Sequence, residues 1–363
     1  MCGTDAETDA GAEADAGAEA DTADADAEAA TGADTADAEA GAGGTRWEVL
    51  LTGPIDDAGR AEIADIAEFT SIDAYPDRAA LAADIDRFDA IIHRPFDLDA
   101  DLLSRATNLR VIAKHGVGVD SIDVEAATRE GIVVCNTPGA NARAVAEHSL
   151  ALLLAVRRRL RPADADLRAG EWPADDDRYL AGELAGRTLG LFGFGDIAGQ
   201  LAGMARGIGM EVAAYDPYVA AADYPEGVRK VGEGALYEAA DLLSVHAPLT
   251  DETRGAIGAA ELAALPADGI VVTAARGGIV VEDALVEALA AGDLAGAGVD
   301  VFAEEPPPDD HPLFDFENVV VTPHIAGTSR EAIRAKATRA AANVRTVYEG
   351  GVPDSALNPE AVE

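Results

Sequence analysis

The fold is decided by the stretch Thr188-Leu189-Gly190-Leu191-Phe192-Gly193-Phe194-Gly195-Asp196-Ile197-Ala198. Its first five residues form an apolar run that predicts a buried strand, and a Gly-x-Gly-x-x-Ala turn follows at once. The first glycine permits a tight bend, and the second lets the backbone approach a pyrophosphate group. Ala198 still allows the next helix to pack closely on the strand. The stretch therefore predicts a strand–turn–helix unit that binds a dinucleotide at Gly193 and Gly195.

A carboxylate follows the next predicted strand. Asp216 lies 21 residues after Gly195, near the spacing at which an acidic residue binds the ribose hydroxyls of a dinucleotide. Its charge would repel a 2′-phosphate, and neither Arg nor Lys follows it directly. The sequence therefore predicts NAD rather than NADP as the cofactor.

The second half of the chain continues this alternation of short apolar runs and helical patterns. Six strands with interleaved helices, opening on a Gly-rich turn, are typical of a doubly wound Rossmann domain. The strands are predicted at 188–192, 212–215, 242–245, 270–273, 297–301 and 319–322, and the helices at 197–209, 259–265 and 282–290.

The first half shows a smaller alternation, which predicts a flavodoxin-like unit with its own parallel sheet. A long helix is predicted at 142–159, followed by a polar, irregular segment at 162–185, and a last helix at 330–348. Within the first half, strands are predicted at 49–51, 90–92, 110–112 and 132–134, and helices at 56–68, 99–106 and 121–129.

The formal net charge of −40 over 363 residues comes from two regions. The first 44 residues hold 13 acidic residues and no Lys, Arg, aromatic residue, Leu, Ile or Val, so we predict a disordered acidic tail over 1–45. The remainder keeps a charge near −27 and contains only three lysines. Such a body is typical of a protein from a salt-rich cytoplasm, because salt screens surface carboxylates. An ordinary acidic protein with a chance bias is the alternative.

This charge disfavours nucleic acid as a partner, since binding needs a basic stripe. The one basic run, Arg157–Arg161, lies at a predicted helix C-terminus before Pro162, where cations complement the helix dipole. A subunit contact is the alternative for that run. No apolar run is long enough to cross a bilayer. Cys135 lies in a buried-strand pattern, and no residue spacing suggests a metal site. We expect a cytoplasmic protein.

A candidate catalytic set lies near the C-terminus. An imidazole titrates near neutrality, as the transfer of an alcohol proton requires, so His324 is the candidate acid–base group. Glu305 can orient that imidazole, and Arg276, just after a predicted strand, can bind a substrate carboxylate in bidentate geometry. Asp300 also ends a predicted strand, and it is expected to bind the nicotinamide amide or to cap a turn. Together these residues describe hydride transfer involving a small anionic alcohol or ketone.

The turn Lys114–Asp120 follows another predicted strand. Successive N–H groups in such a Gly-rich turn form an anion nest, although a plain tight βα turn is the alternative. Arg94 and Lys114 add positive charge, which is notable in so acidic a chain. The predicted substrate contacts are Arg94, Lys114, Gly116, Val117, Gly118 and Arg276.

On these residues the chain resembles the D-isomer-specific 2-hydroxyacid dehydrogenases, which include D-3-phosphoglycerate dehydrogenases, glyoxylate/hydroxypyruvate reductases and D-lactate dehydrogenases. The similarity extends from about Trp47 to Leu357. The motifs that carry it are Lys114–Asp123, Asn136–Asn141, Ala146–His148, the Gly-rich turn, His246–Leu249, Ala275–Gly278, Asp300–Pro306 and Pro323-His324.

The resemblance implies a Rossmann NAD-binding domain at 142–325, inserted in a flavodoxin-like substrate domain made of 46–141 and the returning C-terminal helix of 326–363. It implies that Arg276, Glu305 and His324 are the catalytic triad, in a cleft closed by hinge motion. Family members are commonly homodimers. The implied cofactor contacts are Val117, Gly193, Gly195, Asp196, Ile197, Asp216, Ala247, Pro248, Ala274, Arg276, Asp300, His324 and Gly327.

The chain departs from the family pattern in four places. Asp196 stands where many members carry Arg, Ala198 replaces a glycine, the acidic tail has no counterpart, and no regulatory domain is expected before the end at Glu363. We expect reversible NAD-linked oxidation of a D-2-hydroxyacid, with 3-phosphoglycerate, glyoxylate and hydroxypyruvate left open. An NAD-sensing or corepressor-like protein with little catalysis is the alternative, which the complete triad disfavours.

Overall fold

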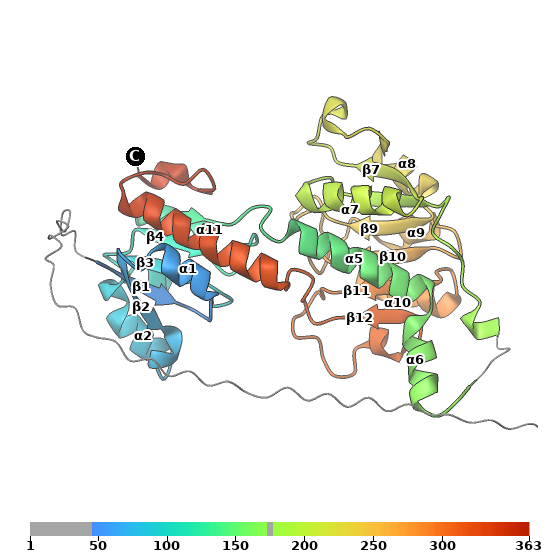
Figure 1. The fold of residues 1–363 in the computed structure, drawn as a ribbon, viewed down its shortest axis with the longest axis horizontal. Coiled ribbons are helices and arrows are strands. Elements are labelled where there is room, and N and C mark those ends of the chain that lie inside the picture. The colour runs from blue at the N-terminus through green and yellow to red at the C-terminus, as the bar shows by residue number, and fades with distance from the viewer. Residues whose placement is uncertain (1–45, 173–176, 363) are drawn as a thin grey trace, which may run out of the picture. The chain divides into compact units, whose positions relative to one another are not determined.

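Two parallel β-sheets form the framework of the computed structural model (Figure 1). The structure describes residues 46–172 and 177–362, so the predicted acidic tail at 1–45 lies outside the described residues. Each sheet is covered by helices, as expected when parallel strands are joined by helical crossovers. The predicted α/β class, with one flavodoxin-like and one Rossmann sheet, is confirmed.

The first sheet has the strand order β2-β1-β3-β4-β5, which is the flavodoxin-like order. Its central strands are apolar and buried, as parallel strands covered on both faces must be. Its strands are β1 (Trp47–Leu51), β2 (Ala67–Ser71), β3 (Ala90–His93), β4 (Val111–Lys114) and β5 (Val133–Cys135), and its helices are α1 (Asp57–Glu62), α2 (Arg78–Asp84), α3 (Ala100–Leu103) and α4 (Val124–Arg129).

The second sheet has the order β12-β11-β10-β9-β6-β7-β8, and the strand order reverses at β6 and β9. Ligands of open α/β sheets bind at such a reversal, beyond the carboxyl ends of the strands. Its strands are β6 (Thr188–Phe192), β7 (Glu211–Tyr215), β8 (Val228–Lys230), β9 (Leu242–Val245), β10 (Ile270–Thr273), β11 (Gly296–Val299) and β12 (Val319–Val321). Its helices are α5 (Ala142–Arg157), α6 (Leu160–Arg168), α7 (Asp196–Gly207), α8 (Glu233–Ala239), α9 (Ala259–Ala263) and α10 (Glu282–Ala291).

The C-terminal helix α11 (Arg330–Tyr348) returns to the first sheet, where it packs on α1 and β4 (Figure 1). Its alanines Ala337, Ala340 and Ala341 are fully buried in that core. The same helix forms hydrogen bonds with the two chain segments that connect the first sheet to the second. Asn343 donates to the carbonyl oxygen of Asn136 at 3.0 Å, and Lys336 donates to that of Gly327 at 2.9 Å. The helix therefore links both crossings to the first sheet.

The predicted helix at 56–68 is wrong in its second half. Helix α1 ends at Glu62, and β2 begins at Ala67 as an edge strand that pairs only with β1. Only Ala67 is fully buried in β2, so this strand lacks the apolar run that marks a central strand. The edge strand β8 of the second sheet was not predicted for the same reason, because only Val228 is buried there.

The predicted irregular segment at 162–185 is also wrong in part. Arg159 adopts a left-handed backbone with a φ of +52°, which ends α5, and α6 then begins at Leu160. Pro162 falls in the first turn of α6, where a backbone N–H has no helical partner to lose. The proline therefore does not end a helix but lies within the start of a new one.

Candidate active site

The Gly-rich turn forms an open cradle at the reversal of strand order. Gly193 has a φ of +89°, and a Cβ there would lie 2.5 Å from the backbone nitrogen of Ala247. The turn therefore packs on the segment after β9, which only glycine permits. Gly195 precedes α7, and a Cβ there would meet no atom of the described residues within 4 Å. This open space before a helix N-terminus suits a pyrophosphate group.

Asp216 connects the Gly-rich turn to the segment after β7. Its Oδ2 accepts the N–H of Phe194, and its Oδ1 accepts the N–H of Tyr218, each at 2.9 Å. The Tyr218 hydroxyl in turn donates to Glu252 at 2.5 Å. The carboxylate expected to bind ribose is therefore held beside the turn expected to bind the pyrophosphate.

Four other predicted cofactor residues fall in three places. Ile197 and Ala274 pack with Val145 and Ala326 in a small apolar cluster. Pro248 is exposed, and its carbonyl oxygen accepts the Thr253 hydroxyl at 2.6 Å. Gly327 lies against Asn141, since a Cβ on that glycine would be 2.7 Å from the Asn141 amide nitrogen.

The Arg276 side chain extends from the end of β10 to the turn Lys114–Asp120, which follows β4 of the first sheet. Its Nε lies 3.3 Å from the Oδ2 of Asp120, and its side chain is about one-third exposed at 32%. A Cβ on Gly118 would lie 1.7 Å from the Arg276 guanidinium. Two of the predicted substrate contacts, Gly118 and Arg276, are therefore in direct contact.

His324 and Glu305 form a close pair. The imidazole Nδ1 lies 2.7 Å from Oε2 of Glu305, whose Oε1 accepts the N–H of Phe302 at 3.0 Å. The His324 side chain is 50% exposed, and no described residue forms a hydrogen bond with its second nitrogen, Nε2. The pairing fixes the tautomer, because Nδ1 must carry the proton that it donates to the carboxylate. An imidazole held in this way can donate or accept a proton at Nε2.

Asp300 lies beneath the His324 segment. Its side chain is fully buried, its Oδ1 accepts the Thr322 hydroxyl at 2.6 Å, and Nε2 of His148 lies 3.5 Å away. Burial acts to raise the pKa of Asp300, but hydrogen bonds from two side chains and two N–H groups together hold it below its ordinary value. Asp300 is thus a charged support within the described structure, and its nicotinamide contact stays a prediction.

Cationic side chains gather where β3 and β4 end. Lys114 Nζ lies 3.2 Å from the Nδ1 of His93, and Arg94 NH1 lies 3.1 Å from the Nδ1 of His115. Both imidazoles use Nε2 to donate to a carbonyl oxygen, of Phe96 and of Ile333 respectively, so each Nδ1 accepts.

Burial dominates the protonation of this cluster. It lowers the pKa of each histidine, His93 and His115, to about 4. Burial and the nearby Arg94 lower the pKa of Lys114 to about 8. Lys114 is therefore mostly charged at neutral pH, and the neutral His93 holds its ammonium group.

The expected anion nest is smaller than predicted. The N–H of Gly116 donates to the Thr137 hydroxyl at 3.1 Å, and the Asn136 amide donates to the carbonyl oxygen of Val117 at 2.9 Å. Within Gly116–Gly118, the N–H groups of Val117 and Gly118 have no acceptor among the described residues, so these two can bind an anion.

The basic run at 157–161 does not act as one surface. Arg157 is buried and donates to the carbonyl oxygen of Asp268 at 3.1 Å. Arg161 donates to the carbonyl oxygens of Phe316 and Val319.

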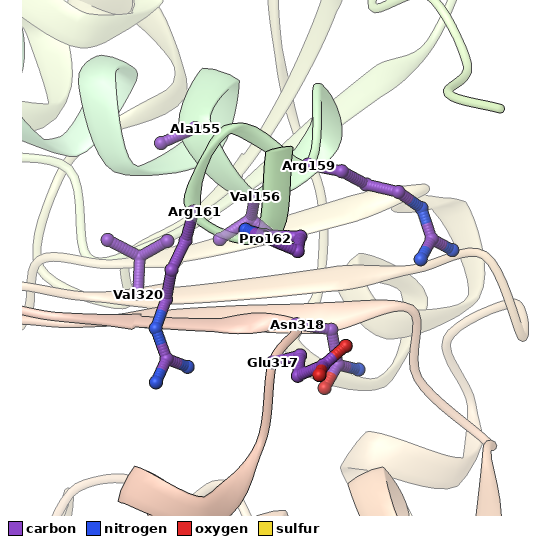
Figure 2. A pocket seen from close by; sticks show the side chains of 8 residues that line it. All are labelled: Ala155, Val156, Arg159, Arg161, Pro162, Glu317, Asn318 and Val320. Atoms are coloured by element: carbon purple, nitrogen blue, oxygen red, sulfur yellow. The ribbon is translucent and has the colours of Figure 1, made fainter. Parts of the chain in front are cut away.

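A cavity of about 200 Å³ lies between the end of α5 and β12. Its lining residues are Ala155, Val156, Arg159, Arg161, Pro162, Glu317, Asn318 and Val320 (Figure 2).

Several polar residues at the site were not predicted from the sequence, and most act through partners distant in the chain. His115, Asp120 and His148 lie within the motifs Lys114–Asp123 and Ala146–His148, although no separate role was predicted for them. His93 is an imidazole at the end of an apolar strand, which was also an available local signal. The group comprises His93, His115, Asp120, His148, Glu282, His311, Thr322 and Lys336.

None of the helices in the described ranges has the length and apolar composition needed to cross a bilayer. Over those same ranges, no three side chains of His, Cys, Asp or Glu are grouped so that they could bind a metal ion.

Proteins similar to this chain include D-3-phosphoglycerate dehydrogenases and glyoxylate reductases. Residues 150–326 match the family model described as D-isomer specific 2-hydroxyacid dehydrogenase, NAD binding domain. The chain is 42% identical over 257 residues to the D-3-phosphoglycerate dehydrogenase of Archaeoglobus fulgidus, covering 70% of this chain and 48% of that protein. It is 37% identical over 331 residues to the glyoxylate reductase of Thermococcus litoralis, covering 87% of this chain and 98% of that protein.

Among solved structures, the NADPH-dependent glyoxylate/hydroxypyruvate reductase of Sinorhizobium meliloti, in complex with citrate, aligns with a TM-score of 0.78. That alignment has 31% identity and covers 87% of this chain and 99% of that chain. The chain spans about half the length of the phosphoglycerate dehydrogenases it matches. Because it aligns with nearly the whole of a glyoxylate reductase at 37% identity, the chain belongs to the D-isomer specific 2-hydroxyacid dehydrogenase family.

Proposed function

We propose that this protein is an NAD-dependent D-2-hydroxyacid dehydrogenase, which oxidises a D-2-hydroxyacid and reduces the corresponding 2-keto acid. The observation that carries the proposal is the pair of His324 and Glu305, 2.7 Å apart, with half of the His324 side chain exposed. Arg276 follows β10, which is separated from β12, the strand before His324, by β11 alone. These strands end at one edge of the sheet, where parallel sheets bind ligands.

In the reducing direction, His324 donates a proton from Nε2 to the carbonyl oxygen of the keto acid. Glu305 stabilises the imidazolium and keeps its ring oriented through Nδ1. Arg276 binds the substrate carboxylate, and its charge polarises the neighbouring carbonyl group. A bound nicotinamide supplies the hydride in this direction and accepts it in the other. In oxidation, His324 removes the hydroxyl proton.

We propose NAD rather than NADP because Asp216 would face a 2′-phosphate with like charge. Glu252, held by Tyr218 next to Asp216, adds a second carboxylate in this region. The cradle at Gly193 and Gly195 supports either dinucleotide, so the choice depends on these acidic groups.

We propose that Arg94 and Lys114 bind an anionic group of the substrate. A phosphate there would favour 3-phosphoglycerate as the substrate, and the substrate carboxylate alone would favour glyoxylate or hydroxypyruvate. The two cations are partly buried and held by neutral histidines. Such preorganised cations suit a small dianion, so 3-phosphoglycerate is our first choice.

A homodimer in a salt-rich cytoplasm completes the proposal. Leu154, Leu160 and Leu167 are exposed on α5 and α6, and burying them against a second copy would remove apolar surface from water. The net charge of −40 supports a salt-rich setting, because screening reduces the repulsion between surface carboxylates. Light scattering in molar KCl tests the assembly: the mass of a dimer is expected, and that of a monomer contradicts it.

The activity is tested by NADH oxidation in molar KCl with glyoxylate, hydroxypyruvate, pyruvate and 3-phosphohydroxypyruvate supplied in parallel. We expect turnover to be fastest with 3-phosphohydroxypyruvate. Faster turnover of an unphosphorylated acid would contradict the substrate but keep the reaction class. Binding of NADH without turnover of any of the four acids would contradict the proposed activity.

A further inference from the structure

A second carboxylate–imidazole pair lies behind the loop that carries Glu305. Glu282, the first residue of α10, has its Oε2 3.2 Å from Nε2 of His311. Its Oε1 accepts the backbone N–H of Ala303 at 2.7 Å. The side chains of Glu282 and His311 are 23% and 9% exposed, so this pair is largely shielded from water.

The imidazole of this pair is held by two hydrogen bonds and by two aromatic neighbours. Its Nδ1 accepts the N–H of Leu313 at 3.3 Å, so Nε2 carries the proton and donates to Glu282. The ring packs against Phe302 and Phe314, with centroid separations of 5.3 and 5.4 Å. His311 therefore holds the Glu282 carboxylate in one place.

Two glutamates bind successive N–H groups of the same loop. The N–H of Phe302 donates to Glu305, and the next N–H, of Ala303, donates to Glu282. The first contact lies within the loop, whereas the second connects the loop to α10. The loop that aims Glu305 at His324 is therefore held to the rest of the sheet domain through Glu282.

The same loop also touches the turn that carries Arg276. A Cβ on Gly277 would lie 1.9 Å from the carbonyl oxygen of Phe302, so the two backbones are in direct contact. Because glycine allows this approach, the Arg276 turn packs directly on the backbone of the Glu305 loop. The Glu305 loop is therefore held both by this packing and by the hydrogen bond to Glu282.

Stability of α10 does not require this geometry. An acidic residue in the first turn stabilises a helix through its dipole wherever its side chain points, and Asp283 already occupies that turn. Glu282 instead has both carboxylate oxygens bound to residues 21 and 29 positions away in the chain.

We propose that Glu282 is a positioning residue for the triad: through Ala303 it fixes the loop that aims Glu305 at His324, and His311 fixes Glu282. The inference rests on the proposed function, since it gives Glu282 a role in the reaction assigned above. A purely structural residue would affect stability alone, whereas a positioning residue acts on the rate through Glu305.

The test compares Glu282→Ala and Glu282→Gln with Glu261→Ala and Glu261→Gln. Glu261 is a matched control, because its carboxylate also accepts one backbone N–H, that of Gly258 at 2.9 Å, but at the start of α9. The rate of hydride transfer is measured in single turnover with NADH and the most active keto acid, together with NADH affinity and the melting temperature.

We expect Glu282→Ala to slow hydride transfer about tenfold, because small misplacements of a catalytic group are costly. NADH affinity should change less than twofold. Glu282→Gln should lose less of the rate than Glu282→Ala, because its amide oxygen can still accept the Ala303 N–H although its NH₂ group would face His311. The Glu261 variants should lower the melting temperature without slowing the reaction. Equal effects of the Glu282 and Glu261 substitutions on the rate would overturn the proposal.

A double-substitution cycle with Glu305→Gln separates this proposal from the function on which it rests. If Glu282 acts through Glu305, adding Glu282→Ala to Glu305→Gln should slow the reaction less than twofold, because coupled residues are not additive. A full tenfold further loss would overturn the positioning role. An unchanged rate in Glu305→Gln alone would instead contradict the proposed triad.

Discussion

The carbonyl oxygen of Asp300 accepts the backbone N–H of His324 at 2.8 Å. The backbone of His324 is left-handed, with a φ of +51°. A left-handed backbone is uncommon in a residue other than glycine and costs about 1 kcal/mol or more. The next two N–H groups, of Ile325 and Ala326, donate to the Asp300 carboxylate at 2.9 Å each. Asp300 thus holds the conformation in which the His324 ring reaches Glu305.

Replacing Asp300 with Asn should slow turnover much more than it weakens cofactor binding. The amide would present an NH₂ group to one of the two N–H groups that the carboxylate accepts, which releases the strained segment at His324. We expect kcat to fall between about tenfold and a hundredfold, in the range of acid–base catalysis. The loss of charged hydrogen bonds should cost about 2 kcal/mol of unfolding free energy.

The measurement is kcat beside NADH affinity from fluorescence titration. A large loss of NADH affinity with an unchanged rate of the bound complex would show instead that Asp300 acts on the nicotinamide, which was the expectation from the sequence.

Replacing Gly118 with Ala should impair substrate binding. The new Cβ would lie 1.7 Å from the Arg276 guanidinium, which must then move away from its position. We expect the KM for the keto acid to rise about tenfold or more, because Arg276 is the proposed carboxylate ligand. Gly203→Ala is the control, since a Cβ at Gly203 in α7 meets no described atom within 4 Å. A KM that changes equally little in both variants would contradict the contact.

The protonation of Lys114 predicts a pH dependence of substrate binding. Burial and Arg94 lower the pKa of Lys114 to about 8, so the ammonium group is lost as the pH rises through that value. A dianionic substrate that pairs with Lys114 should therefore show a KM that increases above pH 8, and a bound anion would move the change to higher pH.

The measurement is KM against pH for 3-phosphohydroxypyruvate and for glyoxylate, in the parent protein and in Lys114→Gln. The phosphorylated acid should lose affinity more steeply, and Lys114→Gln should remove the difference. Identical pH profiles for the two acids in the parent protein would count against a phosphate at Lys114.

Cofactor choice should depend on Asp216. Replacing this residue with Asn removes the charge that a 2′-phosphate would face, while the amide oxygen can still accept one of its two N–H partners. We expect the ratio of NADPH to NADH affinity to increase about tenfold at low salt, with a smaller change in molar KCl because of screening. Titration of both cofactors measures the ratio. Tighter binding of NADPH than NADH by the parent protein would refute the argument.

The sequence predicted the central strands and the edge strands β5 and β12, but it missed the edge strands β2 and β8. Central parallel strands are buried on both faces, so β6, β9 and β10 appear as continuous apolar runs. The edge strands β2 and β8 each bury a single residue, and this leaves no such run. Helix α6 was missed because the break before it depends on one left-handed residue, Arg159, and not on the proline that follows.

The site shows the same division between local motifs and distant partners. Glu305 and His324 lie within recognisable motifs, and the sequence suggested their pairing. The contacts of Glu282 with Ala303, and of Arg276 with Asp120, join segments that become neighbours only through strand order and loop path. A residue such as Glu282, at the start of a helix, has an ordinary local explanation in sequence, so its second role required the structure.

The central claim is that His324 transfers the proton, whereas NADH affinity depends mainly on the Gly193–Gly195 turn and Asp216. The most direct measurement is the rate of keto-acid reduction by His324→Ala in molar KCl, with NADH affinity determined on the same sample. We predict a loss of turnover of at least about a hundredfold with NADH affinity within severalfold of the parent protein. Turnover equal to that of the parent protein would contradict the account.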